Sequence, residues 1–295
     1  MIDYKVSRLL PGTYVEERDK KHIENRSFDY VMMDQIDGCR PALFYLPSRP
    51  KRGLSSLVTV LPRLVIPPSF RTHIISLFHD FAFGGHLGER RTYERVSRDY
   101  YWSTCLEDCI AYVKSCKVCQ AMKVDRRTPA RPAGHIEDAI APFELVSMDF
   151  VGPMIPKSGD FEYILVLVDH FTRWAITIPC VNTTAETVAR ILVNEVYCRY
   201  GTPRRLLSDR GSQFHSNLLR ELHKYLNVKQ LFTSAHHPQT NGMVERFNGT
   251  LKNMLLSVVA EFGVDWEHPL QSVAFAYNTS VHDETHITPF RCIYG

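Results

Sequence analysis

The stretch FELVSMDFVGPMIPKSGDFEYILVLVDHFTRWAITIPC, residues 143–180, carries the strand pattern that decides the fold. It contains three apolar runs, FELVSMDFVGP, FEYILVLVDHF and TRWAITIPC, and turn residues separate them. Short connections between successive strands are typical of hairpins. The stretch therefore predicts three consecutive strands that pair in one sheet.

Residues after 180 alternate between helix and strand patterns. TAETVARILVNEVYCRYG has the periodicity of an amphipathic helix, which Gly201 and Pro203 end. RRLLSDRG and KQLFTSAH predict strands, SNLLRELHKYLN predicts a short helix between them, and a longer helix runs from about Asn241 to Glu261. Strands that join first as hairpins and later through helices predict an α/β fold with a mixed sheet and helices packed on it.

Composition is that of a globular protein. The 295 residues allow two or three domains, and 44% are hydrophobic and 23% charged. No apolar run approaches the roughly 18 residues of a membrane span, and the N-terminus MIDYKVSRLLPG lacks the apolar core of a signal peptide. We therefore expect no membrane partner, and we expect the eight cysteines to be free or metal-bound thiols in a reducing compartment.

Charge is unevenly distributed along the chain. Residues 1–134 carry a net charge of +7 and residues 135–295 a net charge of −4. A basic front half suits a polyanionic partner, although ordinary surface variation produces the same imbalance. An acidic back half suits such a partner only when bound cations offset its charge.

Four parts are predicted along the chain. Residues 1–65 form an extension of uncertain fold that includes the strand-like run LVTVLPRLVIPP. Residues 66–122 hold three helical patterns. Residues 123–137 have the Pro, Gly and Arg content of a basic linker, which could lie along a phosphate backbone. Residues 138–295 hold the predicted mixed sheet.

Two histidines and two cysteines in the helical part have the order of a zinc site. His79 and His86 are spaced H-x6-H, and Cys116 and Cys119 form a C-x2-C pair that one tight turn aims at a single ion. Two His and two Cys provide the four ligands of a tetrahedral zinc site. Small helices that share a limited core need such a metal ion for stability. With all four positions filled by protein, the site is predicted to be structural rather than catalytic.

Other interpretations of these residues exist. The C-x2-C pair could be a chance spacing beside core histidines, and His73 is a competing ligand for which we favour a surface or packing role. Cys105 and Cys109 lie one helical turn apart, where buried thiols commonly act as small apolar side chains.

Three carboxylates in the C-terminal half predict a second metal site. Asp149 lies on a strand that is otherwise apolar, where an unpaired carboxylate is costly. Asp209 ends the next long strand pattern, and Glu245 lies in the first turn of the helix that follows. Three neighbouring carboxylates favour Mg²⁺ or Mn²⁺, and two such ions about 3.5–4 Å apart support in-line phosphoryl transfer on a nucleic acid.

The helix that carries Glu245 has two stripes. Glu245, Asn248 and Lys252 form a polar stripe beside an apolar one, so the polar stripe emerges where the apolar stripe packs on the sheet. The apolar stripe consists of Val244, Phe247, Leu251, Leu255 and Val258.

Each carboxylate also has an ordinary structural interpretation. Asp149 could pair with an arginine, Asp209 could be a turn residue, and Glu245 could simply favour a helix N-terminus. Asp169, which ends the strand run LVLVDHF, is a rival third carboxylate, and we expect it to bond the local backbone instead. The sequence contains no GxSxG, Walker A or GxGxxG motif, so hydrolase-elbow and nucleotide-fold interpretations have no support.

Together these motifs resemble the retroviral and retrotransposon integrases, in particular those of gypsy-type long-terminal-repeat elements. The resemblance covers about residues 60–295 and rests on H-x6-H…C-x2-C followed by D-x59-D-x35-E, and on the surrounding runs GGHLGERRTYERVSRDYYW, YVKSCKVCQ, SMDFVGP, LVLVDHFTRW, YGTPRRLLSDRGSQF, SAHHPQTNGMVERFNGTLK and TPFRCIYG. It implies a ribonuclease-H-like α/β core with a mixed five-stranded sheet and flanking helices, preceded by a small helical zinc-binding domain.

The resemblance also implies an activity and its residues. The activity is processing of element DNA ends followed by strand transfer into target DNA, by a homo-multimer acting in the nucleus. Asp149, Asp209 and Glu245 match the catalytic triad that binds Mg²⁺ or Mn²⁺. The implied zinc ligands are His79, His86, Cys116 and Cys119, and the implied DNA contacts are Asn248, Lys252, Arg246, Gln239 and Asn241.

Some positions depart from the family pattern. The family often has Gln where Met243 stands and an aromatic residue where His236 stands, and both positions bear on the loop before the helix. The sequence stops just past the core, so we expect a fragment or a host gene derived from an element. Alternatives to an integrase-type transferase are a non-catalytic DNA- or chromatin-binding protein and a metal nuclease of ribonuclease H type.

Overall fold

A computed structural model describes residues 29–33, 42–46, 61–122, 139–233 and 242–295. The chain splits into two compact units, residues 1–120 and 121–295, which are described separately below. The basic linker, His236, Gln239 and Asn241 lie outside the described residues.

The larger unit is built on a mixed five-stranded sheet, as predicted. Its strands are β5 (Leu145–Val151), β6 (Tyr163–Asp169), β7 (Ala175–Cys180), β8 (Arg205–Ser208) and β9 (Lys229–Phe232), in the order β7-β6-β5-β8-β9. The first three strands pair antiparallel, whereas β8 and β9 join in parallel. The turn-linked runs thus form the hairpins, and the strands that follow helices form the parallel half.

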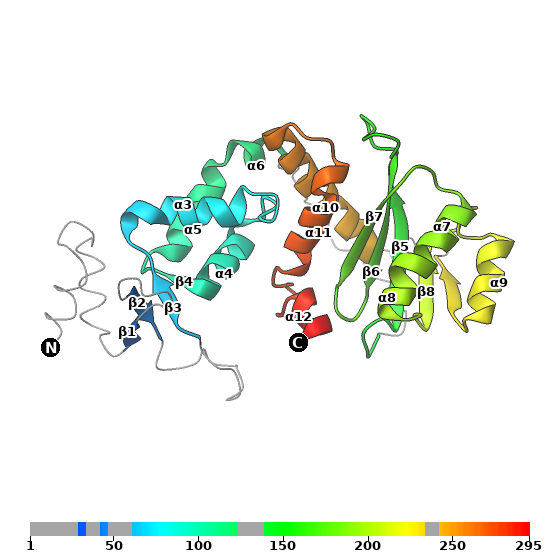
Figure 1. Cartoon of the computed structure of the whole chain (residues 1–295), viewed down its shortest axis with the longest axis horizontal. Coiled ribbons are helices and arrows are strands. Elements are labelled where there is room, and N and C mark those ends of the chain that lie inside the picture. The colour runs from blue at the N-terminus through cyan, green and yellow to red at the C-terminus, as the bar shows by residue number, and fades with distance from the viewer. Residues whose placement is uncertain (1–28, 34–41, 47–60, 123–138, 234–241) are drawn as a thin grey trace, which may run out of the picture. The chain divides into compact units, whose positions relative to one another are not determined.

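Helices from the middle of the chain cover one face of this sheet. Figure 1 shows α7 and α9 beside the sheet. Val146 and Met148 of β5 pack in one buried cluster with Val188 of α7 and Leu219 of α9. The helices of this face are α7 (Ala185–Ile191), its continuations η2 (Leu192–Tyr197) and α8 (Cys198–Tyr200), and α9 (Asn217–Tyr225). The predicted helix, residues 184–200, therefore forms with a π-helical turn in its middle.

Helices α10 (Gly242–Phe262) and α11 (Glu267–Asn278) cover the opposite face, and α12 (Pro289–Tyr294) follows them. The helix α10 packs against β5 and β6, and α11 packs against β7. The predicted apolar stripe of α10 is buried. Because side chains alternate along a strand, Asp149 lies on the α10 face of β5, opposite Met148.

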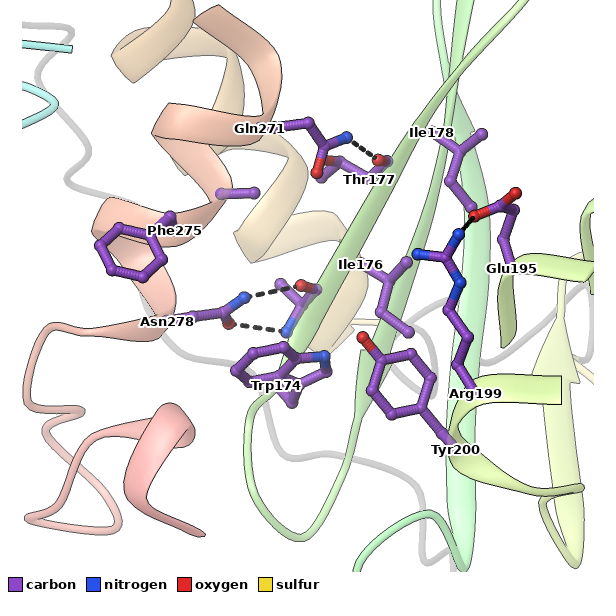
Figure 2. A pocket seen from close by; sticks show the side chains of 12 residues that line it. Trp174, Ile176, Thr177, Ile178, Glu195, Arg199, Tyr200, Gln271, Phe275 and Asn278 are labelled. Atoms are coloured by element: carbon purple, nitrogen blue, oxygen red, sulfur yellow. Dashed lines mark hydrogen bonds and ion pairs between the residues drawn. The ribbon is translucent and has the colours of Figure 1, made fainter. Parts of the chain in front are cut away.

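The edge strand β7 is covered by side-chain amides of α11. The Asn278 side chain accepts a hydrogen bond from the Ala175 N–H at 2.9 Å and donates one to the Ala175 carbonyl at 2.8 Å. Gln271 donates to the Thr177 carbonyl at 2.7 Å, beside a cavity of about 310 Å³ (Figure 2). These backbone groups are therefore satisfied without a further strand.

The described part of the smaller unit combines four helices with a four-stranded sheet. Its helices are α3 (Pro68–His79), α4 (Glu89–Asp99), α5 (Cys105–Ser115) and α6 (Lys117–Met122), and the sheet has the strands β1 (Tyr30–Met33), β2 (Ala42–Tyr45), β3 (Arg63–Val65) and β4 (Tyr100–Tyr101). Ile75, Val96, Trp102 and Cys109 form its core. The extension of uncertain fold thus adds strands to the helical module, because β3 pairs in parallel with β4 between α4 and α5. Within the described residues, no helix is long and apolar enough to cross a bilayer.

Candidate metal centres

The four predicted zinc ligands meet in the smaller unit. One potential ligand atom from each of His79, His86, Cys116 and Cys119 lies within 4.8 Å of the others. Cys119 Sγ is 3.3 Å from His79 Nε2 and 3.7 Å from His86 Nδ1, and Cys116 Sγ is 3.6 Å from His86 Nδ1. Zinc bond lengths imply ligand separations of about 3.3–3.8 Å in a tetrahedral site. The donor set therefore fits a structural zinc ion.

A tight turn brings His86 back to His79. The His86 N–H donates to the His79 carbonyl at 3.0 Å, and the Gly84 N–H donates to the Phe81 carbonyl at 2.6 Å. A Cβ atom on Gly84 would lie 2.7 Å from the His79 carbonyl oxygen, closer than real side chains approach. The close approach of backbone to backbone thus requires glycine at position 84.

Thr92 sets the tautomer of His79. The Thr92 hydroxyl donates to the Leu87 carbonyl at 3.0 Å, so its oxygen accepts from His79 Nδ1 at 3.3 Å. The Nε2 lone pair then points toward Cys119 and is free for a metal. Burial, followed by the neighbouring His86, lowers the pKa of His79 to about 4, which keeps the ring in the neutral form that metal binding needs.

The rival ligands lie elsewhere. His73 is exposed on α3 and is not part of the converging set. Cys105 and Cys109 are buried free thiols in the core of the smaller unit. A hydrogen bond that the Cys105 thiol donates to Cys109, followed by burial, raises the pKa of Cys105, so this thiol stays protonated and packs as an apolar group.

Strand register explains the spacing of the first two carboxylates. Parallel pairing sets Leu145 opposite Arg205 and Ser147 opposite Leu207. The same offset, continued by two residues, sets Asp149 beside Asp209, which directly follows β8. Neighbouring strands lie about 4.8 Å apart. The D-x59-D spacing is thus the register of two adjacent parallel strands.

Asp149 is partly buried and accepts a hydrogen bond on each carboxylate oxygen. Its Oδ1 accepts from the Phe150 N–H at 2.8 Å, and its Oδ2 accepts from Asn248 Nδ2 at 2.9 Å. The pKa of Asp149 is raised to about 6, chiefly by burial and then by the charges of Asp209 and Glu245, while the hydrogen bonds from the Phe150 N–H and Asn248 act in the opposite direction. The pairing of β5 with β8 and the hydrogen bond from Asn248 of α10 to Asp149 bring the segments that carry the three carboxylates to one region.

The other two carboxylates are held more loosely. Asp209 accepts from the Gly211 N–H at 2.9 Å, the bond expected of a turn residue, and Glu245 is exposed in the first turn of α10. Among the described residues, these carboxylates do not converge as closely as the His and Cys ligands. Like charges repel, so a cation is needed to draw them together.

The predicted companions of Glu245 separate into two groups. Arg246 and Lys252 are exposed on α10. Asn248 is buried, and its amide donates to Oδ2 of Asp149, so it orients this carboxylate; its DNA contact stays a prediction. Sequence spacing placed Asn248 on the same stripe as Glu245, but its contact with Asp149 depends on which face of β5 meets α10.

Asp169 lies at the end of β6, where we expected a structural carboxylate. It accepts from the Thr172 N–H at 2.9 Å, from the Thr172 hydroxyl at 2.6 Å and from the Phe143 N–H at 3.0 Å. It closes the turn between β6 and β7.

Comparisons with known proteins match both units. Residues 66–125 match the integrase zinc binding domain, and residues 139–238 and 226–281 match models of the integrase core domain. The chain is 30% identical over 223 residues to the retrovirus-related Pol polyprotein from transposon 412 of Drosophila melanogaster, covering 75% of this chain and 18% of that protein. It is also 30% identical over 223 residues to the transposon Tf2-3 polyprotein of Schizosaccharomyces pombe, covering 75% of this chain and 17% of that protein.

A solved structure has the same overall fold. A chain in the cryo-EM structure of the simian T-cell lymphotropic virus intasome in complex with PP2A regulatory subunit B56 gamma aligns with a TM-score of 0.50 and 17% sequence identity, covering 76% of this chain and 74% of that chain. The present chain spans less than a fifth of the curated polyproteins it matches. With its HHCC zinc-binding unit and its integrase core, the chain belongs to the retroviral and retrotransposon integrase family, and its curated relatives are gypsy-type polyproteins.

Proposed function

We propose that this chain catalyses metal-dependent polynucleotidyl transfer on DNA, comprising 3′-end processing and strand transfer, at Asp149, Asp209 and Glu245. The observation that supports the proposal is the parallel pairing of β5, which carries Asp149, with β8, which Asp209 follows, together with the hydrogen bond from Asn248 that joins the helix of Glu245 to the partly buried Asp149. Uncompensated carboxylates are costly to hold together, and a bound cation removes that cost.

The donor chemistry fits Mg²⁺ or Mn²⁺. All three groups are carboxylates, which hard divalent cations prefer, and Asn248 and the Phe150 N–H orient the oxygens of Asp149. When bound, two such ions supply activation of the attacking oxygen and stabilisation of the leaving oxygen. Asp149, Asp209 and Glu245 would hold them, and Asn248 would keep Asp149 in position.

Exposed cations on α10 support a nucleic-acid substrate. Arg246 follows Glu245, and Lys252 lies two turns further along the same helix. We propose that both contact DNA phosphates and so position the strand end. We propose DNA contacts for Gln239 and Asn241 as well. We also propose that several copies of the chain assemble on element and target DNA and that they act in the nucleus. The described zinc unit is assigned a structural role, because its four ligands leave no position for a substrate.

The decisive experiment uses the full chain and a branched DNA duplex whose 3′-hydroxyl already lies beside the phosphodiester. This substrate tests phosphoryl transfer without requiring recognition of a particular DNA end. With Mg²⁺ or Mn²⁺ we expect a joined product, and we expect Glu245→Gln to reduce it to background. The matched control is Glu221→Gln, which makes the same change at an exposed position on α9 and should leave the joined product unchanged.

Other outcomes distinguish the alternatives. A nicked product without joining, lost in the same variant, would point to a metal nuclease of ribonuclease H type. DNA binding without any metal-dependent product, with folded protein, would contradict the proposal in favour of a non-catalytic DNA- or chromatin-binding role.

A further inference from the structure

One arginine in the turn between β6 and β7 reaches two segments far from it in sequence. Arg173 has a positive φ of 66°, which is uncommon for a residue with a side chain. Its backbone N–H donates to the Asp169 carbonyl at 3.0 Å, and Asp169 is itself fixed by Thr172. The turn is therefore held in a strained conformation that aims this side chain inward.

The guanidinium of Arg173 makes two contacts across the fold. Its Nη1 donates to the thioether sulfur of Met243 at 2.8 Å, and its Nη2 lies 2.5 Å from Oε2 of Glu284. The Arg173 side chain is only 17% exposed, and its Nε is buried without a hydrogen-bond partner among the described residues. Removing a guanidinium from water to this extent costs free energy, and only well-placed contacts offset that cost.

Met243 stands two residues before Glu245, in the first turn of α10. The first N–H groups of a helix have no acceptors within the helix, so this turn frays most easily. One turn later, Asn248 ties the helix to Asp149 on β5. Arg173 supplies a second tether on the other side of Glu245, and Glu284 fixes the orientation of that tether.

We propose that Arg173, oriented by Glu284, is a positioning residue that holds the first turn of α10 and thereby places Glu245 relative to Asp149. This proposal rests on the function proposed above, because that function gives Glu245 its role as a metal ligand. The side-chain contacts of Arg173 are with Met243 and Glu284. Arg173 acts through the helix start, and carboxylate ligands tolerate only small displacements.

The test measures the helix start and the metal site separately in the full chain. Hydrogen exchange followed by mass spectrometry reports on residues 242–250, and calorimetry with Mn²⁺ reports on the carboxylates. In Arg173→Gln we expect faster exchange confined to residues 242–250 and Mn²⁺ affinity reduced about tenfold, as for loss of other groups that orient metal ligands. Glu284→Gln keeps the arginine but removes its orienting charge, and we expect a smaller change in the same direction.

The matched control is Arg199→Gln, which breaks the exposed ion pair with Glu195 on the opposite face of the sheet. It should change neither measurement. Unchanged exchange in Arg173→Gln would overturn the proposal, and so would faster exchange throughout the core, which would make the arginine a general stabiliser. Absence of Mn²⁺ binding by the unaltered protein would count against the proposed function, whereas the exchange data would still decide whether Arg173 holds the helix.

Discussion

At His79, one hydroxyl group decides which ring nitrogen is available to a metal. Thr92 donates to Leu87 and accepts from Nδ1 of His79, which leaves Nε2 facing Cys119. The four ligands were predictable from their spacing. Thr92 was not, because its role comes from helix packing that brings α4 against the end of α3.

Thr92→Val is expected to weaken zinc binding. Valine has nearly the same shape but cannot accept the Nδ1 proton, so the ring loses its preferred tautomer and orientation. We expect zinc affinity to fall by about 10- to 100-fold, measured by competition with a chromogenic chelator. Thr72→Val, an exposed substitution on α3, serves as the control. Equal affinities in the two variants would show that Thr92 does not orient the ligand.

The hydrogen bond between Asn248 and Asp149 leads us to expect that metal binding depends on pH. The pKa of Asp149 is raised to about 6, so protons compete with Mn²⁺ as the pH falls through this range. The hydrogen bond from Asn248 lowers this pKa. Asn248→Ala should therefore raise it further and shift the loss of Mn²⁺ binding to higher pH, as calorimetry between pH 5.5 and 8 would detect. A shift to lower pH, or none, would contradict this electrostatic account.

At the scale of elements, local sequence patterns were sufficient to predict the strands and helices of the core. Period-two and helical patterns place β5 to β9 and α10 because each depends on residues close in sequence. Pairing is less local. The parallel contact of β3 with the two-residue strand β4 leaves no periodic signal, so the sheet of the smaller unit was not predicted. The register of β5 and β8 likewise became clear only from the structure.

The contact of Asn278 with the edge strand β7 leads us to expect that replacing this residue destabilises the fold. Its side chain satisfies both backbone groups of Ala175, so Asn278→Ala would leave a buried N–H and carbonyl without their partner. We expect the free energy of unfolding to fall by about 1–3 kcal/mol, measured by urea denaturation. Asn194→Ala, at an exposed position in η2, should have a much smaller effect. A loss at Asn278 no larger than that control would mean that the edge does not depend on this amide.

At the scale of the whole molecule, the two compact units differ in what stabilises them. The sheet of the larger unit is covered on both faces by buried clusters and long helices. The core of the smaller unit rests on a few buried side chains, such as Ile75, Val96 and Trp102. Small cores of this kind commonly depend on a metal staple, and zinc binding then contributes directly to folding.

Removal of zinc should therefore unfold one unit and spare the other. With a chelator we expect hydrogen-exchange protection to be lost across α3 to α6, whereas β5 to β8 keep theirs. Acid should have the same selective effect, because protonated histidines and thiols do not bind metal. Adding zinc back at neutral pH should restore protection, and magnesium should not, because it disfavours sulfur and nitrogen ligands. Loss of protection in both units together would show that the core, too, depends on the His and Cys site.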